Sequence, residues 1–357
     1  MTSQDIVRYR LASQQISATR FKQAHELVKW MGAMQAQDYL GAKWAIGLRL
    51  PAVTDADVEQ ALADRKIVRT WPQRGTLHFI APEDTRWRLA LSAERILARA
   101  RGRHQQLELD DKTFETSRQL FADALRGGNS FTRAEMLEVL ERGGIATQNQ
   151  RGYHILGQCA LTTQLCFGAL RGKQQTFVLL DEWLPKTKEL SREESLARLA
   201  KSYFISHGPA TIQDLAWWSS LTLAEIRIGL ESVAPDLHSE TLGKQTYWMS
   251  KTMPAPSPPG NGYLLPGFDE YLLGYKDRSA ILNNEHVQKV LPGGNGIFVP
   301  TVLLDGRVAG IWKRAIKKSG AVIALSPFSK LDKAQLDSLK AAAERYSHFI
   351  GLPVTIS

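Results

Sequence analysis

Met34-Gln35-Ala36-Gln37-Asp38-Tyr39 is the segment around which the N-terminal part of the sequence is organised. An amphipathic run with helical spacing, 25–31, precedes it, and a second such run, 40–50, follows it. Asp38 is a residue type that often caps the start of a helix, so we expect the second helix to begin directly after it. The two glutamines then lie on a junction between helices. In an extended backbone, side chains two positions apart point to the same side, so both could face one small target.

This junction belongs to a pattern of three helices followed by two strands. We predict the third helix and the strands at 55–64 (capped by Thr54), 67–71 and 76–80, with a turn at Pro72 and Gly75. A long helix with a basic face is expected at 83–103. The order of three helices and a hairpin is typical of a winged helix, a relative of the helix-turn-helix.

The same order is predicted twice more along the chain. The second copy has helices at 113–126, 132–142 (a capping box of Thr132 and Glu135) and 149–166, with a wing at 168–180 and its tip at Gly172-Lys173. The third has a helix at 192–206, a helix capped by Thr211 that carries Leu215, Trp217 and Trp218, and a helix capped by Thr222 that carries Ile226, Leu230 and Val233, with a wing at 237–250. Trp217 and Trp218 are expected in its core.

The C-terminal part has a different character. A Pro-rich stretch, 253–260, predicts a linker or a rigid loop. Strands are then expected at 263–265, 296–299, 302–304, 308–312 and 322–325, with a hairpin turn at Asp305-Gly306 and a helix at 332–349. The fold class is therefore α+β: about three tandem winged-helix motifs and a small β-barrel-like sheet with a closing helix. The predicted domains are 1–105, 106–188, 189–252 and 253–357.

The bulk composition favours a nucleic acid as partner. The 357 residues carry a formal net charge of +9, and the basic residues are spread along the chain, which suits a large groove. No apolar run is long enough to cross a bilayer, and the first residues lack the layout of a signal peptide. Cys159 and Cys166, about 10 Å apart if the stretch is helical, are expected to be buried reduced thiols. We therefore expect a cytoplasmic protein without a membrane partner, and a monomer.

Several chemistries have no support in the sequence. The eight histidines do not pair at ligand spacing and no Cys-x-x-Cys occurs, so we expect no metal and no cofactor. No Walker sequence is present. Ser202, Ser206 and His207 lie close together, but no Gly-x-Ser-x-Gly elbow accompanies them, so no nucleophile is assigned there.

Three blocks of the chain resemble one enzyme family. They are the Gln-Ala-Gln segment, Thr70-Trp71-Pro72-Gln73-Arg74-Gly75-Thr76-Leu77-His78, and the block from Leu265 to Arg278, Leu-Pro-Gly-Phe-Asp-Glu-Tyr-Leu-Leu-Gly-Tyr-Lys-Asp-Arg. In this order they resemble the AlkZ-like DNA glycosylases, the azinomycin-resistance and YcaQ-related family. The resemblance implies tandem winged helices and a monofunctional DNA glycosylase that hydrolyses the N-glycosidic bond of cationic N-alkylated purines, such as N7-alkylguanine or an interstrand cross-link derived from it.

The resemblance also implies which residues act. Gln35 and Gln37 match the family's catalytic motif and would position water and stabilise an oxocarbenium-like transition state. The expected partner is duplex DNA that contains alkylated purines. Residues expected to contact DNA are Arg74 and His78, alternating on one strand, with Arg99, Arg101, Arg103, Arg151, Lys173, Lys313 and Arg314. Asp269, Tyr271, Tyr275, Asp277 and Arg278 form a polar cluster that favours a structural lock over a catalytic role.

A second interpretation stays open at this point. The chain could be a non-catalytic winged-helix regulator that reads base edges through the helix at 149–166, whose start carries Gln148, Asn149, Gln150 and Arg151. Three unequal copies in one chain argue against it, because regulators usually gain a second half-site by dimerising. A regulator would prefer particular sequences of undamaged DNA, whereas a glycosylase would not.

Overall fold

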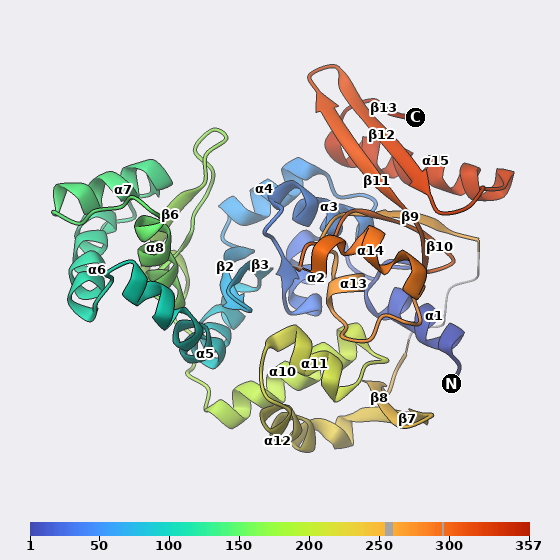
Figure 1. Ribbon diagram of the computed structural model, residues 1–357, viewed down its shortest axis with the longest axis horizontal. Coiled ribbons are helices and arrows are strands. Elements are labelled where there is room, and N and C mark those ends of the chain that lie inside the picture. The colour runs from blue at the N-terminus through green and yellow to red at the C-terminus, as the bar shows by residue number, and fades with distance from the viewer. Residues whose placement is uncertain (254–259, 295) are drawn as a thin grey trace. The chain divides into compact units, whose positions relative to one another are not determined.

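The computed structural model describes residues 1–253, 260–294 and 296–357. The chain forms two compact units: unit 1 comprises 1–58 and 196–357, and unit 2 comprises 59–195 (Figure 1). The predicted linker at 253–260 lies almost wholly outside the described residues. None of the described helices is long and apolar enough to span a membrane.

The first part of unit 1 is helical, as the hydrophobic periodicity predicts. Its elements are α1 (Ser3–Ser13), α2 (Ala24–Met31), β1 (Met34–Gln35), α3 (Tyr39–Arg49) and the start of α4 (Asp55–Ala63). The predicted caps are confirmed: Asp38 accepts from the Gly41 amide at 3.1 Å, and Thr54 accepts from the Asp57 amide at 3.3 Å. Helix α1 was not predicted.

Unit 2 contains a β-hairpin, a long helix and a group of helices around a small sheet. Its elements are β2 (Val68–Gln73), β3 (Thr76–Ile80), η1 (Pro82–Asp84), α5 (Thr85–Gln106), α6 (Asp111–Leu125), β4 (Phe131–Thr132), α7 (Arg133–Arg142), α8 (Arg151–Leu161), β5 (Leu165–Phe167), β6 (Thr176–Leu179), α9 (Leu180–Trp183) and the start of α10 (Arg192–His207). Strand β6 pairs with both β4 and β5. A single apolar core, which includes Trp71, Phe121, Met136 and Phe177, holds α5 to α8 on this sheet.

The predicted helix at 149–166 is wrong at both ends. Asn149 and Gln150 have positive φ angles of 54° and 73°, so α8 begins only at Arg151. It ends at Leu161, because Thr163 also adopts a positive φ of 63° and the chain then enters strand β5. Cys166 therefore lies on a strand and not on the helix of Cys159. Both cysteines are buried and free, as predicted.

The second part of unit 1 begins with the predicted order of helices and hairpin. Helix α10 is followed by α11 (Ile212–Ser219), α12 (Leu223–Val233), η2 (Ala234–Asp236), β7 (Leu237–Leu242) and β8 (Gln245–Ser250). Thr211 and Thr222 each form a complete capping box, because a carboxylate three residues later accepts from the cap's backbone amide. Trp218 is buried as predicted, but Trp217 is 42% exposed, which corrects its assignment to the core.

The C-terminal part of unit 1 is a curled five-stranded sheet in the order β13-β12-β11-β10-β9, with α15 beside it (Figure 1). Its elements are β9 (Gly262–Leu265), α13 (Glu270–Leu273), η3 (Asn284–His286), α14 (Val287–Val290), η4 (Pro292–Gly294), β10 (Thr301–Leu304), β11 (Arg307–Lys317), β12 (Gly320–Pro327), α15 (Lys333–Ile350) and β13 (Val354–Ile356). The hairpin turn at Asp305-Gly306 is confirmed, with both φ angles positive, at 51° and 77°.

Two features of this sheet differ from the prediction. The segment 296–299 is not a strand: Pro300 offers no backbone donor, and the Val299 amide instead bonds to Val290 at 3.1 Å. Strand β13, which pairs in parallel with β12, was not predicted. The fold class is mixed α+β as predicted. The count of three winged helices and the four domain boundaries stay predictions.

Candidate active site

The two glutamines lie on a non-helical segment, as the sequence predicts. Helix α2 ends at Met31, and Gly32 turns the chain with a φ of 75°, a conformation that favours glycine. Gln35 lies at the end of β1, and α3 does not begin until Tyr39. Gln35 is 8% exposed, whereas Gln37 is classed among the exposed residues. The backbone therefore leaves helical geometry at both glutamines, and convergence of their side chains on one target stays a prediction.

Asp38 ties the end of this segment to the rest of unit 1. Its carboxylate caps α3 and also lies 3.3 Å from the guanidinium of Arg314 on β11. Gly41 leaves room for this carboxylate in its capping position, since a Cβ there would lie 2.4 Å from Oδ2 of Asp38. Further along α3, the Trp44 indole donates to the Leu264 carbonyl at 2.7 Å. The sheet thus holds the helix that follows the glutamines.

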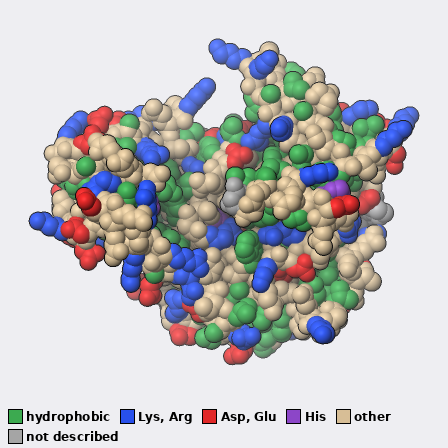
Figure 2. Space-filling view, in the orientation of Figure 1, with side chains coloured by type: hydrophobic (Ala, Val, Ile, Leu, Met, Phe, Trp, Pro, Cys, Tyr) green, Lys and Arg blue, Asp and Glu red, His purple; other side chains and the backbone are tan. Residues whose placement is uncertain are grey.

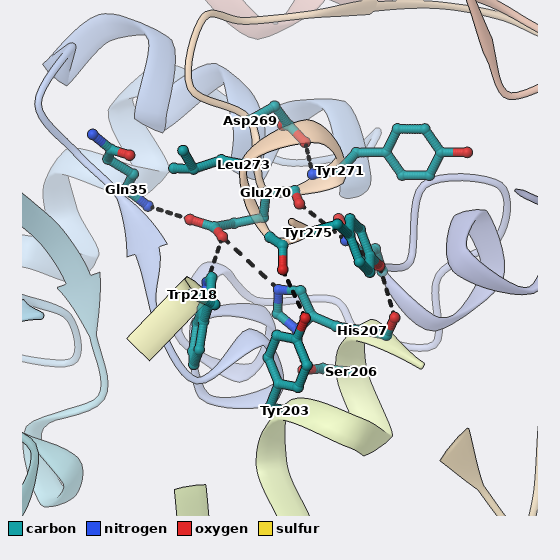
Figure 3. Close-up of polar contacts among 12 residues, drawn as sticks. Gln35, Tyr203, Ser206, His207, Trp218, Asp269, Glu270, Tyr271, Leu273 and Tyr275 are labelled. Carbon is teal, nitrogen blue, oxygen red and sulfur yellow. Dashed lines mark hydrogen bonds and ion pairs between the residues drawn. The ribbon is translucent and has the colours of Figure 1, made fainter. Parts of the chain in front are cut away.

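A buried glutamate holds the other end of the segment. The backbone amide of Gln35 donates to Oε1 of Glu270 at 2.8 Å, and the indole of Trp218 donates to Oε2 at 2.7 Å. The Glu270 side chain is 1% exposed. In Figure 3 the side-chain amide of Gln35 lies at the far end of the residue from this bond. Glu270 therefore holds the backbone of Gln35, while the side-chain amide of Gln35 points away from this bond.

His207 completes the surroundings of this carboxylate. Its Nε2 lies 3.9 Å from Oε2 of Glu270, its Nδ1 lies 2.8 Å from Oγ of Ser206, and Tyr203 stacks on its ring (Figure 3). Burial lowers the pKa of His207, and the Glu270 carboxylate opposes that change. Ser206 and His207 are both 0% exposed. The Ser206–His207 pair is therefore closed off from solvent, and the expectation that no nucleophile lies here stays a prediction.

Part of the predicted polar cluster forms a buried structural lock: Asp269, Tyr271 and Tyr275 are buried, whereas Asp277 is exposed and Arg278 is half-buried. Arg49, at the end of α3, donates two parallel bonds to the Asp269 carboxylate, each 2.8 Å long. Its other three N–H groups bond to the Ala45 carbonyl and to the backbone and side-chain oxygens of Gln14, at 2.8 to 2.9 Å. Tyr275 donates to the His207 carbonyl at 2.7 Å. This lock lies directly beside Glu270 and so supports the same segment.

Arg74 and His78 do not alternate on one strand, which corrects the prediction. Arg74 lies in the turn between β2 and β3 with a φ of 56°, since β2 continues through Pro72 to Gln73 and β3 begins only at Thr76. Its guanidinium still reaches Nε2 of His78 at 3.2 Å. A guanidinium can only donate, so Nε2 accepts and Nδ1 carries the proton that is donated to the Thr76 carbonyl at 2.9 Å. His78 is 0% exposed and held as this tautomer; contact of either residue with DNA stays a prediction.

The other basic candidates have different surroundings. Arg99, Arg101 and Arg103 are exposed on α5, as are Lys173 at the tip of the β5–β6 connection and Lys313 on β11. Arg151 is half-buried, and its guanidinium bonds to the backbone carbonyls of Leu107, Ala146 and Glu108, the last two at 2.9 and 3.1 Å. Arg314 is engaged by Asp38. Figure 2 shows Lys and Arg side chains spread over the visible face, as the sequence predicts.

Glu270 and Trp218 are the residues at this site that the sequence interpretation did not assign. Glu270 stands inside the third block that resembles the family, next to Asp269, and that position was the only signal for it. Its partners Gln35 and Trp218 are 235 and 52 residues away in the sequence, so no local spacing reveals them.

Comparisons with known proteins agree with this fold. A relative from Streptomyces sahachiroi, named "Interstrand DNA cross-link repair glycosylase", is 24% identical over 374 residues, covering 98% of each chain. The solved structure "Streptomyces sahachiroi DNA glycosylase AlkZ" matches with a TM-score of 0.80 at 24% identity, covering 100% of both chains, and so shows the same fold. The family model "DNA glycosylase AlkZ-like" matches residues 28–349. Because that match spans most of the sequence, the chain belongs to the AlkZ-like family of DNA glycosylases.

Proposed function

We propose that this enzyme is a monofunctional glycosylase that hydrolyses the N-glycosidic bond of cationic N-alkylated purines in duplex DNA, with Gln35 and Gln37 at the reacting centre. The observation that carries the proposal is the exposed Gln37 on a non-helical segment that Glu270 and Asp38 hold at its two ends. Family membership supports an enzyme over the non-catalytic regulator.

Glutamines suit this reaction because the leaving group already carries a positive charge. Ordinary glycoside cleavage uses one carboxylic acid to protonate the leaving group and a carboxylate to activate water or to attack. An N7-alkylated purine leaves as a neutral base without protonation. The enzyme then needs to position a water and to offer dipoles to an oxocarbenium-like centre, and the amide oxygens of Gln35 and Gln37 can do both.

Asp38 and Glu270, the carboxylates placed at the two ends of the segment, are already engaged. Asp38 caps α3 and pairs with Arg314, while Glu270 accepts from Gln35 and Trp218. Taking up a proton as a general base would remove the charge that strengthens these bonds. This arrangement favours the amides as the groups that face the water.

The substrate proposal extends to cross-links. The Streptomyces relative is named for interstrand cross-link repair, and we infer the same class of lesion for this chain, alongside single N7-alkylguanines. Phosphates are proposed to contact the exposed cations on α5, Lys173 and Lys313, with tandem winged helices as the scaffold and the protein acting as a monomer. Changing Arg101 to alanine should weaken binding uniformly across sequences and lower the slope of log affinity against log salt by about 1.

The test uses a duplex that contains N7-methylguanine, with abasic sites detected by alkaline cleavage. Base release by the wild type should collapse in Gln37→Ala and fall in Gln35→Ala, while Gln119→Ala, at an exposed glutamine on α6, should match the wild type. Release that survives both active-site substitutions would move the site elsewhere. If the wild type binds DNA with a sequence preference and releases no base, the proposal fails.

A further inference from the structure

Glu270 is buried in a place where two donors approach it from different directions. The Gln35 amide reaches Oε1 at 2.8 Å and the Trp218 indole reaches Oε2 at 2.7 Å. Both groups can only donate. The position therefore needs an acceptor at each end, and a carboxylate provides this, whereas an amide of the same shape offers one acceptor and one donor. The chemistry of the side chain, and not only its size, fits these two partners.

The proton positions around His207 follow from its neighbours. The Ser206 hydroxyl donates to the Ser202 carbonyl at 2.7 Å, so its oxygen accepts from Nδ1 of His207 at 2.8 Å. In a neutral ring Nε2 is then unprotonated. It faces Oε2 of Glu270 at 3.9 Å and has no hydrogen-bond partner among the described residues. Oε2 of Glu270, which accepts from the Trp218 indole, therefore also faces the unprotonated Nε2 of His207.

We propose that Glu270 is a positioning residue for the glycosylase reaction, which holds the backbone of Gln35 so that the two glutamine amides are fixed relative to the attacking water. The inference rests on the proposed function of Gln35 and Gln37. Strand β1 has two residues, and the Glu270 carboxylate gives its backbone a charge-assisted bond at the residue that carries the first glutamine amide. Because the Glu270 side chain is buried, it acts through Gln35 and does not touch the substrate.

The size of the effect follows from the need for accurate placement. Displacing a reacting group by about 1 Å can lower the rate about 10²-fold. In Glu270→Gln, the new amide can accept from Gln35 or from Trp218 but presents its NH₂ to the other donor. We expect single-turnover release of N7-methylguanine to fall about 10²-fold, with the affinity for DNA unchanged, since no DNA contact is altered.

A second substitution should restore part of this rate. In Glu270→Gln combined with Trp218→Phe, the indole donor is gone, so the amide oxygen can accept from Gln35 while its NH₂ turns toward the vacant Nε2 of His207. The double variant should therefore release base faster than Glu270→Gln alone. A role limited to general stability predicts the opposite, because the second change removes another buried contact.

Hydrogen exchange of the segment separates this inference from the proposed function. The peptide that contains the Gln35 amide should exchange slowly in the wild type, faster in Glu270→Gln, and again slowly in the double variant. Glu285→Gln is the matched control: this glutamate also lies beside a histidine, 3.3 Å from His286, but its side chain is 71% exposed. It should change neither exchange nor base release.

The outcomes are distinguishable. If the wild type releases no base but the exchange pattern holds, the proposed function is wrong and the positioning of the segment stands. If Glu270→Gln exchanges and releases base like the wild type, Glu270 does not position Gln35. If the double variant is slower than Glu270→Gln, or if both lose folded structure to the same extent as they lose activity, the inference is overturned.

Discussion

Replacing Asp269 with asparagine tests whether the lock beside the glutamine segment stabilises the fold. The Arg49 guanidinium and the Asp269 carboxylate are both 0% exposed and joined by two bonds of 2.8 Å. Asparagine keeps the shape but removes the negative charge and replaces one acceptor by a donor. The variant therefore leaves the buried guanidinium without its counter-charge.

The expected cost is about 3–5 kcal/mol, the usual range for breaking a buried ion pair by removing one partner. Three of the five Arg49 donors keep their partners, which places the value toward the lower end. With a urea dependence of about 3 kcal/mol per molar for a unit of this size, the unfolding midpoint should fall by about 1 M or slightly more.

The assay is urea unfolding followed by hydrogen exchange of peptides from unit 1. Asp337→Asn is the matched control, since Asp337 forms a 2.9 Å pair with Lys340 while both side chains are more than half exposed. Its midpoint should equal that of the wild type. An Asp269→Asn midpoint that is no lower than that of the control would refute the reasoning, because the buried pair would then contribute no more than a solvated one.

Three further predictions concern burial and packing. Because burial lowers the pKa of His207 below about 6.5, the unfolded state takes up its proton first as the pH falls. The free energy of unfolding of the wild type should therefore drop more steeply from about pH 7 to 5 than that of His207→Asn. An equal pH dependence in the two proteins, or an equally reduced one in the exposed-site control His238→Asn, would contradict this. Burial raises the pKa of both cysteines to about 12, so a thiol reagent at neutral pH should modify them only after unfolding, and rapid labelling of the folded protein would show the assignment to be wrong. Gly41→Ala should destabilise the protein by about 1 kcal/mol or more, because the new Cβ displaces the Asp38 cap of α3. Gly102→Ala is the control and should not destabilise it, since a Cβ there would meet nothing within 4 Å. Equal melting temperatures for the two variants would count against the close approach at Gly41.

Local chemistry made much of the fold predictable. Thr132 and Glu135 form a capping box three residues apart, and the structure confirms it because both partners lie within one turn. The Asp305-Gly306 turn was recognisable for the same reason. The end of α8 was not, since it depends on a left-handed Thr163 and on pairing between β5 and β6, neither of which is encoded in helical periodicity.

The candidate site likewise has one part that the sequence predicts and one part that it does not. The non-helical junction at Gln35 and Gln37 follows from the helix spacing on each side and from the cap at Asp38. The support for that junction does not: Glu270 reaches Gln35 across 235 residues, and only the folded chain brings them together. The exposure of Trp217 was likewise missed, because helical spacing places it correctly on α11 without showing which face of the helix is covered.

The central claim is that uncharged amides suffice because the base leaves without protonation. The most direct test compares single-turnover release of N7-methylguanine with release of neutral hypoxanthine from otherwise identical duplexes. A general acid contributes about 10²–10⁴-fold, so without one the neutral base should leave at least about 10²-fold more slowly. Release of hypoxanthine at a comparable rate would require an acid that this account does not contain, and would contradict it.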